Sequence, residues 1–225
     1  MTKMTPPEPR PEMLDKICQY ASTALLSDCM DEAGYRHNVL HHRLRPLKNG
    51  VIVAGWARTV RWVDVDEVDE HPYDVEIEVI DSLRPHDVIV HAQDIALRNA
   101  PWGELMSTVA MKRGAAACIC DSCIRDTRRI NQLGFPVWYT AIKPLDSRGR
   151  GKVVEYDIPV ICGEVLIQAG DLIVSDDDGV ISIPQSLVER IVPKAIEKGT
   201  LENQTRQGLE QGRTLREMYD QYGVL

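Results

Sequence analysis

The sequence predicts an α/β fold in which helices at both ends of the chain flank a strand-rich middle. Helix-like apolar spacing occupies residues 13–34 and 185–225, whereas short valine- and isoleucine-rich segments fill residues 50–184. Glycine, proline and aspartate turns separate those segments. The chain has 225 residues and 44% hydrophobic content, so it can bury a core of its own.

The N-terminal part predicts a flexible arm followed by a helix. Residues 1–12 contain four prolines and several charges, and the folded domain is expected to span residues 13–200. The segment STALLSDCMDEAGYR predicts a helix with Ser22 or Thr23 as its N-cap and Gly34 at its end. Next, GVIVAGWARTVRWVDVD predicts two short strands or one bent strand.

Two helix and strand units are predicted in the middle of the chain. Residues 72–92 alternate like a strand at first, but Val75, Val79 and Leu83 share helical spacing, so we predict a helix and then the strand DVIVHA. WGELMSTVAMKRGAAACICD predicts a helix ended by Gly114 and then a buried strand. The apolar face of that helix is expected at Leu105, Met106, Val109 and Ala110.

The last part of the chain predicts strands and then a long helical region. Strand-like segments are FPVWYTAI, GKVVEYDIPVIC, EVLIQ and DLIVSDDDGVISIP. Ser186 is the predicted cap of a following helix, and Pro193 is expected to kink it. Residues 201–225 predict a polar helical tail with a narrow apolar face, the kind of segment that packs on a neighbouring subunit.

The charge balance argues against a protein that works by binding nucleic acid. The chain has 34 acidic and 26 basic residues and a formal net charge of -8, whereas nucleic-acid affinity depends on clustered lysine and arginine. No run approaches the roughly 18 apolar residues of a membrane span, and the N-terminus contains no apolar core of a secretory signal. We therefore expect a cytoplasmic protein with a small-molecule or protein partner.

Three cysteines lie close together in AAACICDSCIRD. Cys120 and Cys123 form a CxxC pair and Cys118 adds a third thiol, but no second pair at zinc-site spacing exists and the histidines are scattered. We interpret Cys118 and Cys120 as small buried residues of a strand and place Cys123 at the border of a pocket. A zinc or redox site is the alternative.

Arg125 and Asp126 follow this strand at its end, where ligands gather in layered α/β sheets. The guanidinium of Arg125 suits a carboxylate, and the carboxylate of Asp126 suits Mg²⁺ or Mn²⁺. The alternative is a solvated ion pair. Gly103 precedes a helix whose first amides could bind an anionic oxygen. Glu104 could reach a cation or its water, or could only complement the helix dipole.

Two acidic stretches are interpreted as structural. Asp176, Asp177 and Asp178 could form a metal cluster, but Asp-Gly after a strand is a strong turn signal, and we favour a turn. The run VDVDEVDEHPYD predicts a solvated face.

These motifs together resemble the family that joins RraA, the regulator of ribonuclease activity A, to the 4-hydroxy-4-methyl-2-oxoglutarate aldolases. The resemblance is nearly full length and includes ALLSDCMDEAG, VAGWARTV, FPVWYTAIKPLDSRGR and AGDLIVSDDDGVISIP. The aldolase branch is marked by an aspartate, twenty intervening residues and Arg-Asp. Here residues 105–124 separate Glu104 from Arg125 and Asp126, so the spacing is kept but the first acid is one methylene longer.

The resemblance implies a role for each matching residue. Asp126 would ligate a divalent metal, Mg²⁺ or Mn²⁺, and Glu104 would act through metal-bound water. Arg125 would hold the oxygens of the 2-oxo acid. The helix start at Gly103, with the amides of Leu105 and Met106, would receive the substrate carboxylate. Glu202 matches a glutamate that family members contribute to the metal site from an adjacent subunit.

The implied activity is that of a metal-dependent, class II type pyruvate aldolase. Cleavage of a 4-hydroxy-2-oxo acid such as 4-hydroxy-4-methyl-2-oxoglutarate and decarboxylation of oxaloacetate both leave a pyruvate enolate, so one carbon-carbon lyase site could perform both. The other implied function is a regulatory protein that inhibits ribonuclease E. The implied architecture is a layered β/β/α swivelling-domain fold with flanking N- and C-terminal helices, assembled as a homotrimer or a homohexamer.

Overall fold

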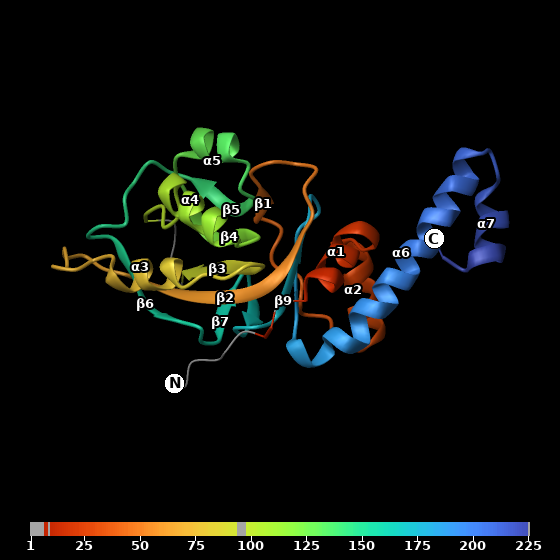
Figure 1. Ribbon diagram of the computed structural model, residues 1–225, viewed down its shortest axis with the longest axis horizontal. Coiled ribbons are helices and arrows are strands. Elements are labelled where there is room, and N and C mark those ends of the chain that lie inside the picture. The colour runs from red at the N-terminus through yellow and green to blue at the C-terminus, as the bar shows by residue number, and fades with distance from the viewer. Residues whose placement is uncertain (1–6, 9, 94–97, 225) are drawn as a thin grey trace.

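A curled sheet of eight strands forms the centre of the fold, and helices cover one face and one end of it (Figure 1). The computed structural model describes residues 7–8, 10–93 and 98–224. The strands of this sheet are β1 Arg45–Pro46, β2 Val53–Asp64, β3 Asp87–Gln93, β4 Ala117–Ile124, β5 Val137–Ile142, β6 Gly151–Tyr156, β9 Leu172–Ser175 and β10 Val180–Ile183. A separate hairpin contains β7 Val160–Cys162 and β8 Val165–Ile167.

The helices follow the same chain order. They are α1 Pro11–Tyr20, α2 Thr23–Glu32, α3 Asp74–Asp81, α4 Glu104–Arg113, α5 Thr127–Leu133, α6 Val188–Glu210 and α7 Leu215–Tyr222, with a 3-10 turn at Gln185–Leu187. None of the described helices is both long and apolar enough to cross a bilayer.

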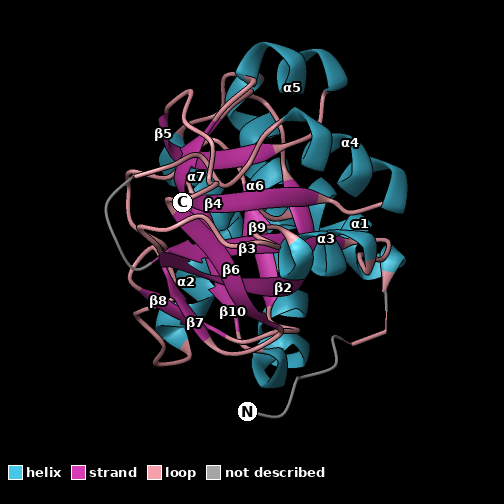
Figure 2. Cartoon of the chain, turned by 90° about the vertical axis from the view of Figure 1, so that its left-hand side faces the viewer, coloured by secondary structure: helices cyan, strands magenta, loops and turns pink. Residues whose placement is uncertain are grey.

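Four parallel strands position the candidate site. Their order is β5-β4-β3-β2, and α3, α4 and α5 are the successive crossovers between them (Figure 2). Antiparallel strands β9 and β6 both pair with β2, which bends at a register shift between Arg61 and Trp62. The carboxyl ends of parallel strands meet at one edge, so the segments that follow β3 and β4 are brought together there.

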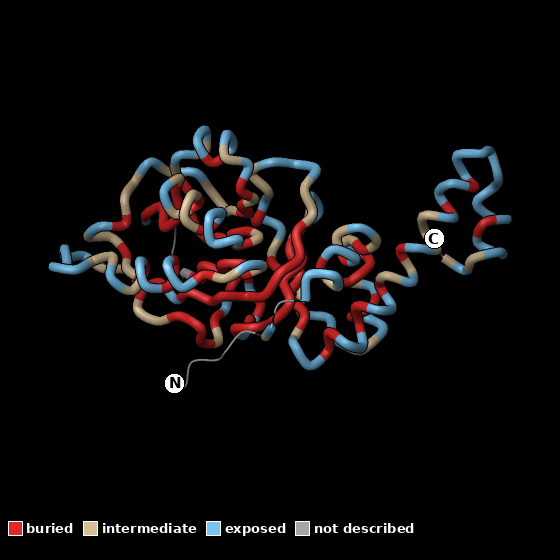
Figure 3. Tube along the Cα trace, viewed as in Figure 1, coloured by how far each residue is buried: buried red, intermediate tan, exposed pale blue. Residues whose placement is uncertain are grey.

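Separate apolar clusters cover the two faces of the sheet, whose strands are mostly buried in Figure 3. Helices α3, α4 and α5 contribute Val79, Ala110 and Ile130 to one cluster. On the opposite face, the β7–β8 hairpin contributes Val160 and Ile167 to a second cluster. The molecule is therefore layered as helix, sheet and hairpin, as the resemblance predicted.

Helices from both ends of the chain pack together against β9 and β10. Helix α6 passes so close to the end of α1 that a Cβ on Gly199 would lie 1.6 Å from the carbonyl oxygen of Tyr20, so only glycine fits there. Beyond this contact, α6 continues past residue 200 and projects from the body with α7 folded back on it (Figure 1). Gly208 receives the side chain of Met218 from α7.

Most predicted elements are confirmed, and the differences have local causes. The Ser22 hydroxyl accepts a hydrogen bond from the amide of Leu25 at 3.2 Å, as expected for an N-cap. The predicted cap at Ser186 is wrong, because Ser186 lies in the 3-10 turn and α6 begins at Val188. The first helix begins at Pro11, inside the predicted arm, most of which lies outside the described residues. Helix α5 was not predicted, because seven polar-rich residues give little periodicity.

Candidate active site

The segment before α4 runs alongside the end of β4 and brings two distant parts of the chain together. Trp102 forms a parallel bridge with Ile124, and the amide of Arg125 donates to the carbonyl oxygen of Trp102 at 3.0 Å. These backbone contacts fix Gly103, the residue before α4, beside Arg125 and Asp126. A spacing of twenty residues in sequence thus becomes direct proximity in space.

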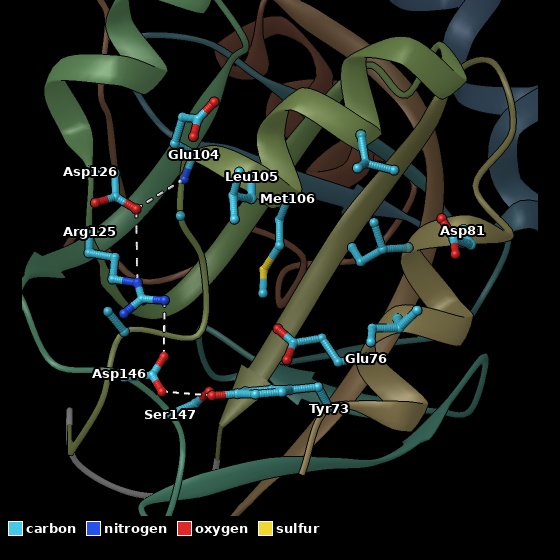
Figure 4. A pocket seen from close by; sticks show the side chains of 15 residues that line it. Tyr73, Glu76, Asp81, Glu104, Leu105, Met106, Arg125, Asp126, Asp146 and Ser147 are labelled. Atoms are coloured by element: carbon cyan, nitrogen blue, oxygen red, sulfur yellow. Dashed lines mark hydrogen bonds and ion pairs between the residues drawn. The ribbon is translucent and has the colours of Figure 1, made fainter. Parts of the chain in front are cut away.

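Asp126 lies at the start of α4, although it belongs to the loop after β4. Its Oδ2 atom accepts a 3.4 Å hydrogen bond from the amide of Glu104 (Figure 4). A Cβ on Gly103 would lie 2.9 Å from the same oxygen, so glycine is required for this approach. Asp126 has φ 57°, in the left-handed region that aspartate tolerates better than most residues. Half of its side chain (49%) is exposed, which leaves carboxylate oxygen available to a ligand.

Polar contacts run from Arg125 through Asp146 to Tyr73 (Figure 4). Its Nη2 atom lies 3.0 Å from Oδ1 of Asp146, whose Oδ2 accepts a 2.7 Å hydrogen bond from the Tyr73 hydroxyl. Burial opposes ionisation of Asp146, but the bonds from Tyr73 and Arg148 and the charge of Arg125 lower its pKa. Burial and the bond to Asp146 raise the pKa of Tyr73 to about 12, so its proton stays on the hydroxyl.

Glu104 contacts Asp126 through its backbone amide, whereas its side chain bonds elsewhere. Its Oε1 atom accepts a 2.9 Å hydrogen bond from the Thr108 hydroxyl, one turn along α4. The carboxylate thus turns back along its own helix while the amide faces Asp126 (Figure 4). Leu105 is 77% exposed, and the buried residues of α4 are Ser107 and Ala110, so the predicted apolar face is wrong for Leu105. Leu105 and Met106 line the pocket instead.

A cavity of about 410 Å³ opens between α3 and α4 above these residues. Five carboxyl groups and one guanidinium, that of Arg125, line it together with apolar side chains from both helices. Glu76 on α3 is only 2% exposed, and its Oε1 atom has no hydrogen-bond partner within the described structure. Burial, reinforced by Asp146 and opposed by Arg125, raises the pKa of Glu76 to about 8.

The donor set of this pocket suits a hard divalent cation better than zinc. Within the described ranges, no group of three histidine, cysteine or acidic residues could hold a metal by itself. Mg²⁺ commonly binds through one or two carboxylates and completes its shell with water and substrate oxygens. The half-exposed carboxylate of Asp126 fits that pattern, whereas a structural zinc site needs four protein ligands.

The other sequence candidates lie elsewhere. Glu202 lies on the projecting helix α6 and does not line the pocket of its own chain, so its predicted role across a subunit interface stays a prediction. Cys123 is 1% exposed and does not line the pocket, so its predicted place at a pocket border is wrong. Cys118 and Cys120 are buried strand residues, as predicted, and burial raises the pKa of both thiols.

The aspartate run forms a turn, as predicted. The amides of Asp178 and Gly179 donate to Oδ1 of Asp176 at 3.0 and 3.3 Å. Both carboxylate oxygens of Asp176 also bind Thr23 at the start of α2, so this aspartate ties the turn to the N-terminal helices.

Three pocket residues were missed from the sequence. Glu76 shares helical spacing with the buried residues Val79, Ile80 and Leu83, and an acid on such an apolar face is a usable signal. Asp146 and Tyr73 carry no comparable signal, because each belongs to a polar segment whose position only the tertiary structure defines.

Comparisons with known proteins found similar sequences and similar folds. A family model described as "RraA-like: Aldolase/RraA" matches residues 23–182. A protein of Halalkalibacterium halodurans, provisionally named 4-hydroxy-4-methyl-2-oxoglutarate aldolase, is 32% identical over 82% of this chain and 84% of its own. Protein DlpA of Legionella pneumophila is 24% identical over 94% of this chain, which spans about a third (34%) of DlpA.

A solved structure extends the likeness to three dimensions. RraAS2 of Streptomyces coelicolor, described as an unusual member of the RNase ES inhibitor RraA protein family, superimposes with a TM-score of 0.78. It is 29% identical, and the match covers 89% of this chain and 98% of that one.

Proposed function

The chain belongs to the RraA-like family, and we propose that it is a divalent-metal-dependent aldolase that releases pyruvate from a 4-hydroxy-2-oxo acid. The observation that carries this proposal is the convergence of Asp126, Arg125 and the start of α4 at one end of a cavity. Oxaloacetate decarboxylation is expected as a side activity, because it passes through the same pyruvate enolate.

The residues at this end would each handle a different part of the substrate. Asp126, assisted by Glu104, would hold Mg²⁺ or Mn²⁺, which when bound supplies Lewis acidity at the 2-oxo group. The amides of Leu105 and Met106, in the first turn of α4, would receive the substrate carboxylate. Arg125, oriented by Asp146, would place positive charge where negative charge develops on the enolate oxygen, so no lysine Schiff base is needed.

A pyruvate-release assay with Asp126→Ala tests this proposal. We expect cleavage of 4-hydroxy-2-oxo acids to fall to background in the variant, and EDTA to abolish wild-type activity until Mg²⁺ or Mn²⁺ is returned. Asp178→Ala is the matched control, since Asp178 is an exposed acid of the aspartate turn. Full wild-type activity in EDTA would contradict the metal-dependent mechanism.

The projecting tail leads us to propose that a neighbouring subunit completes the site in a trimer or hexamer. Leu209, Leu215 and Tyr219 are exposed on α6 and α7, and Glu202 lies on the same projection. If Glu202 acts across an interface, Glu202→Gln and Asp126→Ala should each be impaired, while mixed oligomers of the two variants should regain part of the activity. No recovery after subunit exchange, verified by mass spectrometry, would argue against a shared site.

Inhibition of a ribonuclease is the second candidate function. The observation favouring it is the likeness to the Streptomyces RraAS2 structure, a protein described as an unusual member of an RNase ES inhibitor family. Such binding needs surface complementarity rather than a filled metal site, so Asp126→Ala should still be pulled down with ribonuclease E and still inhibit it. If the wild-type protein neither binds nor inhibits ribonuclease E, the inhibitor function is contradicted and only the aldolase proposal remains.

A further inference from the structure

The cavity between α3 and α4 has two chemically different ends. The end at Arg125 and Asp126 carries the charged groups that the proposed function assigns to the 2-oxo acid head. Away from it, both helices contribute apolar side chains, and α3 also contributes Glu76 and Asp81. Ile77 on α3 is 55% exposed and Leu105 on α4 is 77% exposed in the single chain, and both line the cavity, so apolar side chains face a ligand bound there.

Among the described residues of this chain that line the cavity, a second negative charge on a ligand would meet no free cation. Arg125 is the single guanidinium among the lining residues that the structure describes, and it already lies 3.0 Å from Asp146. Asp81 adds another carboxylate at the α3 side, and Arg113, which lies 3.7 Å from it, is not part of the lining. A carboxylate at the far end of a substrate would therefore be desolvated beside like charges.

Glu76 gives this wall an uncharged polar group. Glu76 is only 2% exposed, and its side chain points into the cavity (Figure 4). Its Oε1 atom has no hydrogen-bond partner in the described structure. Burial in apolar surroundings and the nearby charge of Asp146 both favour the protonated acid, while Arg125 acts in the opposite direction. A protonated carboxyl can donate to a neutral ligand atom without adding charge.

We propose that the cavity selects 2-oxo acids whose far end is uncharged, such as an alkyl chain, and that Ile77 and Glu76 determine this specificity. The inference rests on the proposed function for the placement of the 2-oxo acid head at Arg125. It goes beyond that function because it separates monocarboxylate substrates from dicarboxylates of five carbons in the main chain, such as 4-hydroxy-4-methyl-2-oxoglutarate, whose second carboxylate lies farther from the 2-oxo acid head than that of oxaloacetate.

Calorimetric titration with two ligands of equal chain length tests the inference without turnover. 2-Oxopentanoate and 2-oxoglutarate differ only in a terminal methyl or carboxylate, and neither has the 4-hydroxyl group needed for cleavage. In the presence of Mg²⁺, wild-type protein should bind 2-oxopentanoate at least about tenfold more tightly. Equal binding, tighter binding of 2-oxoglutarate, or binding of neither at millimolar concentration would overturn the inference.

A charge placed on the apolar wall should reverse the preference. Ile77→Arg adds a cation at an exposed position that can tolerate it, so 2-oxoglutarate affinity should rise by about tenfold while 2-oxopentanoate affinity falls. Ile161→Arg is the matched control, because Ile161 is 65% exposed on β7 and outside the cavity. If the ratio of the affinities for the two ligands is unchanged in Ile77→Arg, Ile77 does not determine the specificity.

The two proposals fail in different ways. If no 4-hydroxy-2-oxo acid is cleaved but the tenfold preference for 2-oxopentanoate is observed, the proposed selectivity is supported and the proposed aldolase activity is contradicted. If pyruvate is released more efficiently from 4-hydroxy-4-methyl-2-oxoglutarate than from 4-hydroxy-2-oxopentanoate, the proposed aldolase activity is supported and the proposed selectivity is contradicted.

Discussion

The two ends of the cavity are built by different means. Main-chain pairing positions the charged end, where the Arg125 amide bonds to Trp102 and a glycine lets Asp126 approach α4. The α3 wall instead depends on which side chains one helix presents, Glu76 and Ile77 among them. Groups fixed by a strand end suit chemistry that needs constant geometry, whereas helix surface residues can vary to suit different ligands.

Replacement of Arg125 by lysine should have the largest effect at the charged end. Lysine keeps the charge but cannot contact Asp146 and a substrate oxygen with one planar group, so we expect kcat for pyruvate release to fall by about 100-fold. Arg113→Lys is the control, because Arg113 pairs with Asp81 but does not itself line the cavity. Near-normal kcat in Arg125→Lys would show that charge alone is sufficient.

Glu76→Gln should change the pH dependence of stability at the α3 wall. The folded protein raises the pKa of Glu76 to about 8, through burial and Asp146 against the opposing charge of Arg125. A raised pKa contributes stability at low pH that is lost as pH rises from the unfolded value toward 8. As pH rises through that window, the free energy of unfolding of Glu76→Gln should therefore increase relative to that of wild type by up to about 1.4 kcal/mol per pH unit.

Paired urea denaturation at several pH values measures this difference. Glu67→Gln, on the exposed acidic segment, should give no comparable trend. A constant difference between Glu76→Gln and wild type from pH 5 to pH 8 would mean that Glu76 is ionised throughout.

Gly103→Ala should disturb the charged end through sterics alone. The added methyl would lie 2.9 Å from Oδ2 of Asp126 and 3.3 Å from Cγ of Arg125, so both side chains must move. We expect a loss of about tenfold in kcat/KM, or roughly 1.4 kcal/mol, with little change in Tm. Gly179→Ala has open space around its Cβ and is the control. Unchanged kcat/KM in Gly103→Ala would show that the close approach is unnecessary.

Tyr73→Phe should have the smallest effect, because it removes one contact two steps from the substrate. Without the 2.7 Å bond from the Tyr73 hydroxyl, Asp146 keeps its bonds to Arg125 and Arg148 but orients the guanidinium less firmly. We expect a decrease of about threefold in kcat, within the energy of one hydrogen bond. A decrease as large as that of Arg125→Lys would instead make the hydroxyl a direct substrate contact.

Local pattern was sufficient for much of the fold. The cap at Ser22, the helix within residues 72–92 and the helix ended by Gly114 were predicted because capping and periodicity act over a few residues. The Arg125 and Asp126 pair was also identified from its place after a buried strand. Helix α5 and the start of α6 were not, because short polar segments take their structure from what they pack against.

The sequence by itself determined the charged residues, their spacing and the α/β order of the chain. Only the tertiary structure decided that the Glu104 carboxylate turns toward Thr108, that Asp146 and Tyr73 support Arg125, and that Glu76 faces the cavity without a partner. The physical reason is that spacing along a chain specifies which residues can meet, whereas burial, partner choice and the direction of a side chain depend on segments that are far away in sequence.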